Sequence, residues 1–146
     1  PGYYPYVAFN PTTQSRTTSA KGWALRSGEV AMEGSAAGEY AVVRFVAPVE
    51  SDYVISARFA GIHFNLSTTD VHVLAGEKHL FDADIQGYGG DAAFHMVEGT
   101  NPVASWSGVA HLRAGEAIAF AVGTGSNHTN YNDTTSLVAE VTRQPF

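Results

Sequence analysis

The sequence predicts an all-β fold, an antiparallel two-sheet β-sandwich of jelly-roll type. Helical periodicity is nearly absent, and runs of β-branched, aromatic and small apolar residues recur between clusters of Gly, Asn, Asp and Pro. Only 15% of the residues are charged and 15 are glycines, which suits many turns and a neutral polar surface. Antiparallel arrays of this kind protect their edges by folding into two packed sheets. With 146 residues and 45% hydrophobic content, residues 1–146 are expected to form one domain with its own core.

The clearest strand signals lie in the first half of the chain. Residues 40–47 (YAVVRFVA) form an apolar run, and residues 52–62 follow across the tight turn PVES. Every second residue from Tyr53 to Phe59 is apolar, so one face of this strand is expected to meet a core. The two strands are predicted to form a hairpin. Weaker strand signals occur at residues 6–9, 22–26 and 29–33.

The second half continues the same pattern. Residues 70–76 and 78–85 are joined through a Gly-Glu turn, and residues 107–115 and 116–123 meet at a similar Ala-Gly turn. Both pairs are predicted to be hairpins. Residues 134–142 form the last strand, which gives roughly eight to ten strands in all.

The direction of each strand predicts where the long loops lie. Each short turn reverses the chain, so residues 63–69, 86–104 and 123–133 are expected to emerge at one end of the molecule. The tight turns PVES, AGEK and RAGE would lie at the other end. A further strand at residues 93–97 (AFHMV) would break this arrangement. Because function tends to lie on long loops held by a rigid scaffold, the long-loop end is a candidate binding site.

Charge and composition argue against several classes of partner. The formal net charge is -6 and only eight Lys and Arg are scattered along the chain, whereas a nucleic-acid surface needs clustered basic residues. No apolar run approaches the roughly 18 residues of a membrane span, so no membrane insertion is expected. Cysteine is absent, which excludes a thiolate nucleophile and a Cys-based zinc site. A neutral or cationic partner fits this acidic chain better.

Several segments resemble a known class of proteins. The stretches VVRFVAPVESDYVISARFAGI, TTDVHVLAGEKHLF, GYGG, RAGEAIAFAVGTG and YNDTTSLVAEV are similar to bacterial exported β-sandwich domains of the carbohydrate-binding-module type, within residues 40–142. The insertion at residues 91–105 departs from that pattern, and the last strands also resemble, more loosely, the C1q-type jelly roll. The resemblance implies a non-catalytic, extracellular or cell-surface module that recognises a glycan or polysaccharide. The alternative is a structural or adhesive cell-surface module, including a C1q-like oligomer.

Glycan recognition requires flat aromatic faces and planar polar groups that bracket adjacent hydroxyls. Tyr88, Trp106 and Tyr131 are the aromatic candidates, and Tyr88, between glycines, is the ring expected to be most exposed. Trp23 lies in an apolar stretch and is expected in the core, a role that fits Trp106 as well as ligand binding does. The polar candidates in the predicted loops are Asn65, Asp91, Asn127, Asn130 and Asn132.

The oxygen-rich stretch at residues 127–133 (NHTNYND) also has the composition of a Ca²⁺ site. Ca²⁺ takes six to eight oxygen ligands from carboxylates, amides and backbone carbonyls. Asp133 is the one carboxylate in the stretch, and Asp70 could approach it if the long loops share one end. Short acidic side chains at strand starts also accept hydrogen bonds from loop amides. We favour this second role for both residues and keep Ca²⁺ as the alternative.

Transition-metal and catalytic motifs are weak. The six histidines are isolated in the sequence, and although His72 and His79 could pair across their hairpin, no third ligand is implied. The chain has no G-x-S-x-G elbow. Asp82 and Asp84 lie on one face of a strand, about 7 Å apart, a spacing that a glycosidase pair could use, but a solvated face is expected. A small hydrolase or lyase is therefore the less favoured alternative.

Overall fold

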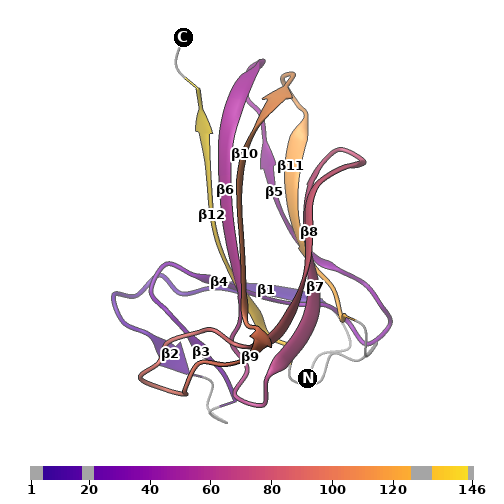
Figure 1. The fold of residues 1–146 in the computed structure, drawn as a ribbon. Coiled ribbons are helices and arrows are strands. Elements are labelled where there is room, and N and C mark those ends of the chain that lie inside the picture. The colour runs from indigo at the N-terminus through magenta and orange to yellow at the C-terminus, as the bar shows by residue number, and fades with distance from the viewer. Residues whose placement is uncertain (1–4, 18–21, 126–132, 145–146) are drawn as a thin grey trace.

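The computed structural model describes residues 5–17, 22–125 and 133–144, which contain twelve strands and no helix (Figure 1). The first large sheet has the order β1 (Tyr6–Phe9), β4 (Val30–Glu33), β12 (Thr135–Arg143), β6 (Ser51–Gly61), β10 (Val103–Leu112). The second has the order β5 (Ala41–Val46), β11 (Ala117–Val122), β7 (Ser67–Ala75), β8 (Lys78–Tyr88), β9 (Glu98–Asn101). A small sheet pairs β2 (Arg16–Thr17) with β3 (Ala24–Leu25). Within these residues no helix is long and apolar enough to span a membrane.

The topology is that of a jelly roll. Eight strands form the sheets β4-β12-β6-β10 and β5-β11-β7-β8, and every pairing in them is antiparallel. Consecutive strands alternate between the two sheets, except where the chain passes through β7 and β8 within one sheet. The predicted antiparallel two-sheet β-sandwich of jelly-roll type is therefore confirmed.

Two of the three predicted hairpins are wrong. β5 pairs with β11 and β6 pairs with β10 and β12, so the turn PVES crosses from one sheet to the other. The turn between β10 and β11 crosses between the sheets in the same way. Of the three predicted hairpins, the one between β7 and β8 is formed. A connection between sheets and a hairpin turn both reverse the chain with the same turn residues, so the sequence pattern does not distinguish them.

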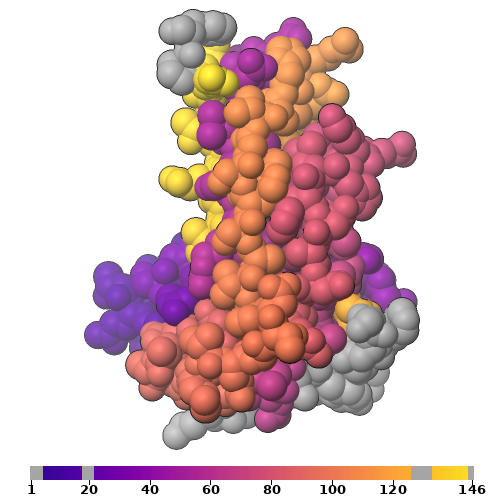
Figure 2. Space-filling model, viewed as in Figure 1, coloured from indigo at the N-terminus to yellow at the C-terminus, as the bar shows by residue number. Residues whose placement is uncertain are grey.

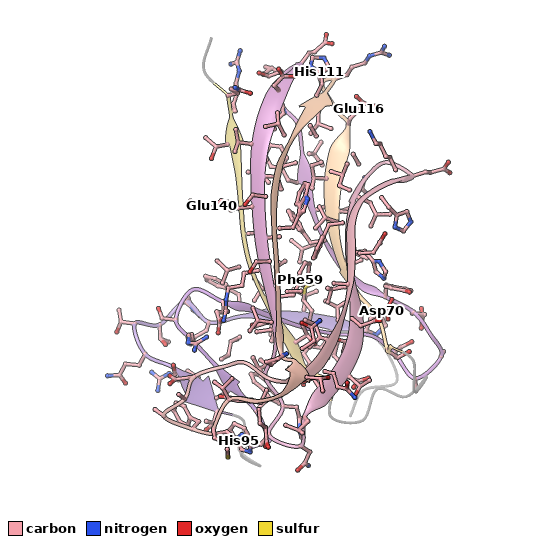
Figure 3. All side chains as sticks on the ribbon, viewed as in Figure 1. Phe59, Asp70, His95, His111, Glu116 and Glu140 are labelled. Carbon is pink, nitrogen blue, oxygen red and sulfur yellow. The ribbon has the colours of Figure 1, made fainter. Side chains whose placement is uncertain are left out.

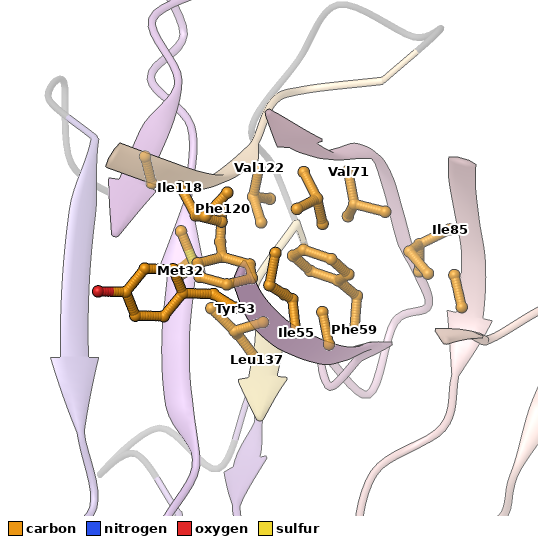
Figure 4. Packing of buried hydrophobic residues seen from close by; sticks show 14 of the residues in the cluster. Met32, Tyr53, Ile55, Phe59, Val71, Ile85, Ile118, Phe120, Val122 and Leu137 are labelled. Carbon is orange, nitrogen blue, oxygen red and sulfur yellow. The ribbon is translucent and has the colours of Figure 1, made fainter. Parts of the chain in front are cut away.

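The main core lies between the two large sheets (Figure 4). Tyr53, Ile55 and Phe59 point from β6 into this space, which confirms the alternation expected for that strand. The Tyr53 hydroxyl donates a hydrogen bond to the carbonyl of Val49 at 2.7 Å, so its polar atom is satisfied. Each large apolar side chain buried in this way stabilises the fold by about 1.5–3 kcal/mol. The opposite sheet contributes Val71, Val73, Ile85, Ile118, Phe120 and Val122.

A single extended segment passes from the second sheet to the first. β9 pairs with β8, and after Pro102 the chain continues as β10 beside β6. Residues 93–97, whose formation of a strand would have broken the predicted loop arrangement, form none, since the strand here begins at Glu98. The crossing brings two backbones together: a Cβ on Gly87 would lie 2.2 Å from the carbonyl oxygen of Glu98.

The described parts of the three long connections lie at one end, as predicted. Ile62 N–H donates to the carbonyl of Thr134 at 3.0 Å, and Gly61 N–H donates to Pro102 at 3.0 Å. These bonds tie the loop after β6 to the segments before β12 and β10. A small second core of Leu25, Ala31, Ile62 and Tyr88 lies under this end.

Candidate functional site

Four of the predicted site residues, Asn127, Asn130, Tyr131 and Asn132, lie outside the described residues. The others are placed. Tyr88, Asp91 and Asn65 belong to the long-loop end, Trp106 lies on β10, and Asp70 and Asp133 lie on or beside the strands that lead into the last long connection.

The prediction that Tyr88 offers an exposed ring is wrong. Its side chain is 0% exposed and packs in the small core beside the rings of Phe64 and His95. The Tyr88 hydroxyl donates to the carbonyl of Asp91 at 2.7 Å, and burial raises the pKa of this phenol to about 12. A Cβ on Gly90 would lie 2.9 Å from the Tyr88 ring. A glycine at position 90 therefore leaves room for the Tyr88 ring to pack against the loop that follows it.

The Asp91 carboxylate stabilises the start of the insertion at residues 91–105 through hydrogen bonds within the protein. The carboxylate accepts a hydrogen bond from the Ser15 hydroxyl at 2.6 Å and another from the Ala93 N–H at 2.9 Å. The Ser15 hydrogen bond lowers the pKa of Asp91. Asn65 is exposed at the same end, and its N–H donates to His63 Nδ1 at 3.0 Å.

Trp106 closes one open side of the sandwich. β10 and β8 lie side by side on the face shown in Figure 2 although they belong to different sheets. The Trp106 ring stacks on Phe81 of β8, with centroids 6.3 Å apart and an interplanar angle of 19°. The ring is half-buried and packs against the main core, so of the two roles that the sequence allowed, the core role is the one this geometry supplies.

Asp70 and Asp133 have contrasting surroundings. Asp70 accepts hydrogen bonds from the Tyr40 hydroxyl at 2.6 Å, His72 Nε2 at 2.5 Å and Gly125 N–H at 2.8 Å (Figure 3). Burial opposes ionisation of Asp70, but these hydrogen bonds outweigh it and lower its pKa. Asp133 is 1% exposed, and its Oδ1 accepts from the Thr68 N–H at 3.1 Å.

The second oxygen of Asp133, Oδ2, has no hydrogen-bond partner among the residues that the structure describes. Burial raises the pKa of Asp133 to about 7, and the nearby charges of Glu33 and Asp70 act in the same direction. A buried carboxylate oxygen without a donor suits a cation, and the oxygen chemistry matches Ca²⁺. Both aspartates accept a hydrogen bond from a backbone amide, which is the role favoured for them from the sequence, and Asp133 keeps one oxygen without a donor from the described residues, whereas Asp70 shares its oxygens with three donors.

The sequence reasoning did not find a concave surface that is bordered by the rings of Tyr40, His72 and His79. It is a trough of about 280 Å³ on the outer face of the second sheet, hereafter the outer-face trough. Ala119 and Ala121 of the central strand β11 form its floor because larger side chains flank them on both neighbouring strands. Its walls are formed by Tyr40, Val42, His72, Leu74 and His79. The signal was present in the sequence as alternate alanines in AIAFAV, which leave one face of β11 with small side chains.

Two histidines and an aspartate meet beside this trough. Asp82 Oδ1 lies 2.5 Å from His72 Nδ1 and 2.6 Å from His79 Nδ1. In a regular strand residues 79 and 82 would point to opposite faces. A β-bulge shifts the register, so that Val73 pairs with Phe81 and Leu74 pairs with His79. The extra residue returns the His79 side chain to the face that carries Asp82.

These contacts also shift the charges of the cluster. Burial disfavours the imidazolium of His72, but the hydrogen bonds that it donates to Asp70 and Asp82 outweigh burial and raise its pKa. The pKa of Asp82 is lowered, first by its hydrogen bond with His72 and then by that with His79. Asp84 is exposed on the same face as Asp82 and is paired across the hairpin with Asp70.

Comparisons with known proteins report on the fold. No protein-family model and no curated protein sequence matches the chain. A structure of CBM51-2 in complex with GlcNAc and INT domains from Clostridium perfringens ZmpB aligns with 99% of this chain and 28% of its own, with 10% identity and a TM-score of 0.53. A CBM4 structure covers 96% of this chain and 86% of its own, with 10% identity and a TM-score of 0.42. The GH26-CBM35 β-(1,4)-mannanase of Podospora anserina covers 99% and 29%, with 17% identity and a TM-score of 0.37.

The chain therefore spans less than a third of the ZmpB and mannanase chains. At 10% identity the likeness to the ZmpB structure shows a shared β-sandwich fold.

Proposed function

We propose that this chain is a non-catalytic carbohydrate-binding module that acts outside the cell or at its surface and binds a glycan in the outer-face trough. The observation that carries the proposal is the trough itself, in which an apolar floor is bordered by an exposed aromatic ring and by carboxylates. The β-sandwich fold shared with the ZmpB structure is consistent with such a role.

The chemistry of the trough suits a sugar ring. Tyr40 is 45% exposed, and its ring stands 5.6 Å from that of His72, centroid to centroid. Small alanines leave room for the apolar C–H face of a sugar, while Asp82 and His79 at the border can accept and donate hydrogen bonds to hydroxyls. The volume of about 280 Å³ lies near the lower limit for ligand pockets, so a short stretch of an open glycan chain is the expected ligand.

A second hollow fits a glycan less well. It measures about 540 Å³ and lies near the tight turns at the end opposite the long loops. Charged side chains such as Arg44, Lys78 and Glu116 dominate its border, and no Phe, Tyr or Trp of the described residues lines it. It therefore lacks the flat ring on which a sugar would stack.

The long-loop end is the rival location within the same function. Asn65 is exposed there. The predicted connection at residues 123–133 holds four further candidates, which lie outside the described residues: Asn127, Asn130, Tyr131 and Asn132. A Tyr131→Ala variant separates this location from the trough, because it should leave binding in the trough intact.

The deciding experiment is a glycan array with and without EDTA, run on the wild type and on two pairs of variants. Tyr40→Ala removes the exposed ring, and Phe9→Ala removes a ring of 57% exposure on the other sheet. Ala119→Trp fills the floor, and Val138→Trp adds the same ring at an exposed position of β12. We expect Tyr40→Ala and Ala119→Trp to lose binding by tenfold or more, with the two controls unchanged. Loss of binding in Tyr131→Ala alone would move the site to the loop end, and binding to no glycan would overturn the proposed function.

We also propose that Asp133 contributes to a Ca²⁺ site at the long-loop end. Its buried, unpartnered Oδ2 is the supporting observation. Millimolar Ca²⁺ added to EDTA-treated protein should raise the melting temperature, since a ligand that binds only the folded state stabilises it. Asp133→Asn should abolish the rise in melting temperature that Ca²⁺ causes. Asp84→Asn, which changes an exposed carboxylate, should retain that rise. An unchanged melting temperature of the wild type would count against the site.

The alternative function, an adhesive or structural module that assembles into oligomers, is favoured by one feature. Phe94, Met96 and Val97 in the insertion are 44%, 67% and 54% exposed, an unusual concentration of apolar side chains on one loop. Molecular mass in solution tests this alternative. A stable trimer that binds no glycan would support the adhesive or structural function.

A further inference from the structure

The β7–β8 hairpin brings together three side chains whose imidazole nitrogens and carboxylate oxygen are common ligands of transition metals in proteins. The ligating atoms of His72, His79 and Asp82 all lie within 4.8 Å of one another. Among the residues that the structure describes, no other group of His and carboxylate side chains reaches three members at that separation. The β-bulge opposite Val73 and Leu74 creates this cluster, because it turns His79 to the face of Asp82.

We propose that His72, His79 and Asp82 bind one divalent transition-metal ion with the ligand preference of Zn²⁺. The site is distinct from the proposed Ca²⁺ site, because none of its ligands is Asp133, but it adjoins the proposed glycan site, because His72 and His79 also line the outer-face trough. Imidazole nitrogen with a single carboxylate suits Zn²⁺, Cu²⁺ or Ni²⁺. Ca²⁺ is excluded from this position by its need for six to eight oxygen ligands.

The neighbouring groups support a metal rather than a simple hydrogen-bonded pair. Asp70 fixes the orientation of the His72 ring, because it contacts the ring nitrogen Nε2 at 2.5 Å. The other ring nitrogen, Nδ1, therefore points toward Asp82. Asp70 is in turn held by the Tyr40 hydroxyl at 2.6 Å. A carboxylate on the second nitrogen of a ligating histidine is the usual arrangement in metal sites, where it fixes the ring and its tautomer. Together Asp70 and Asp82 carry two negative charges, which match the charge of the ion.

The ligands can close on an ion without disturbing the fold. The His72 side chain is 17% exposed and acts as the fixed ligand, whereas the side chains of His79 and Asp82 are 54% and 50% exposed. Rotations of the two exposed side chains would bring the three atoms to the roughly 2.0–2.2 Å bond lengths of a zinc site. Three protein ligands leave one tetrahedral position open, and His72 and His79 also line the outer-face trough.

The same molecule provides a matched control. His111 contacts Glu50 at 2.9 Å and Asp52 at 2.8 Å, so it has the same kind of carboxylate neighbours, but no second histidine. It lies near the tight turns, at the opposite end from His95 (Figure 3). A histidine with two carboxylates at an exposed position is expected to bind Zn²⁺ far more weakly than the cluster on the hairpin.

The test is calorimetric titration of EDTA-treated, dialysed protein with ZnCl₂ and, separately, with CaCl₂. The wild type should bind one equivalent of Zn²⁺. His79→Ala should weaken binding at least tenfold, and Asp70→Asn should weaken it about 10- to 100-fold through the orientation of His72. His111→Ala should leave the affinity within twofold of wild type. Because His79 is exposed, its removal is not expected to unfold the chain, and a circular dichroism spectrum of each variant checks this.

A second readout locates the ion. Zn²⁺ should shift the ring nitrogen resonances of His72 and His79 in an NMR spectrum and leave those of His111 in place. The absence of saturable Zn²⁺ binding near one equivalent would overturn the proposal. So would equal losses of affinity in His79→Ala and His111→Ala, or shifts at His111 alone.

Discussion

Asp133 has a carboxylate that the fold encloses while leaving one oxygen without a donor from the described residues. Burying a polar group without a partner costs about 1–3 kcal/mol, so this residue is retained at a cost to stability. The opposite case is Asp70, where three donors compensate for burial. The difference between the two aspartates shows that the surroundings of a carboxylate, not its residue type, determine which one can accept a cation.

The buried carboxyl predicts how stability depends on pH. Its pKa is about 7 in the folded state and about 3.9 in the unfolded chain. Between these values the folded state holds a proton that the unfolded state has lost, so the contribution of Asp133 to the free energy of unfolding falls as pH rises from about 4 to about 7. In EDTA, Asp133→Asn should therefore gain up to about 4 kcal/mol relative to wild type between pH 4 and pH 8, because a pKa difference of about three units corresponds to about that free energy. Urea unfolding at both pH values measures this, and a constant difference would contradict the prediction.

At the scale of the strands, the segment that crosses between sheets depends on two glycines. Gly87 has a φ of 133° and Gly99 a φ of 108°, and each lies against the backbone of the facing strand. A Cβ on Gly99 would lie 2.4 Å from the carbonyl oxygen of Gln86. These glycines let β9 approach β8 closely before the chain leaves the second sheet at Pro102.

Gly87→Ala should destabilise the protein by more than about 2 kcal/mol, because the new Cβ would collide with the Glu98 carbonyl in addition to straining the backbone. Gly76→Ala is the matched control. Gly76 has a φ of 61° in the β7–β8 turn and nothing within 4 Å of an added Cβ, so it should lose only about 1–2 kcal/mol from backbone strain. Chemical denaturation of both variants measures the difference. Equal losses would mean that the close approach of β8 and β9 contributes nothing.

The strands also show where sequence reasoning succeeds. Alternation in residues 53–59 predicted the buried face of β6, and the turn residues predicted the reversals of direction and hence the end at which the long loops lie. The partner of each strand could not be predicted, because a turn that crosses between sheets uses the same Gly and Asp residues as a hairpin. The approach of His72 and His79 across their hairpin was expected from the sequence and is observed, but Asp82 as the third member was not, because the bulge that turns His79 toward Asp82 depends on strand pairing. Tyr88 shows the limit for single residues, since glycines around a ring permit burial as readily as exposure.

At the scale of the whole molecule, the described residues form two apolar clusters, and the two tryptophans report on them separately. Trp106 packs against the main core, whereas Trp23 packs against the small core under the long loops. If residues 1–146 form one domain, as we propose, both clusters should unfold in a single cooperative transition. Fluorescence of Trp23→Phe and Trp106→Phe variants during urea unfolding should give midpoints that agree with circular dichroism of the same variant. A lower midpoint for the Trp23 signal would instead indicate that the small core unfolds by itself.

β12 lies between β4 and β6 in the middle of the first sheet, although it is the last strand along the chain. During synthesis, the edges of β4 and β6 that face each other therefore stay unpaired until β12, Thr135–Arg143, has been made. Bare strand edges of this kind invite pairing with other molecules. A ribosome-bound chain that stops before Thr135 would thus have nearly all of its apolar residues and still lack the strand that completes its sheet. Such distant pairings are also slow to form, so the first sheet is completed only after Thr135–Arg143 has been synthesised and has inserted between β4 and β6.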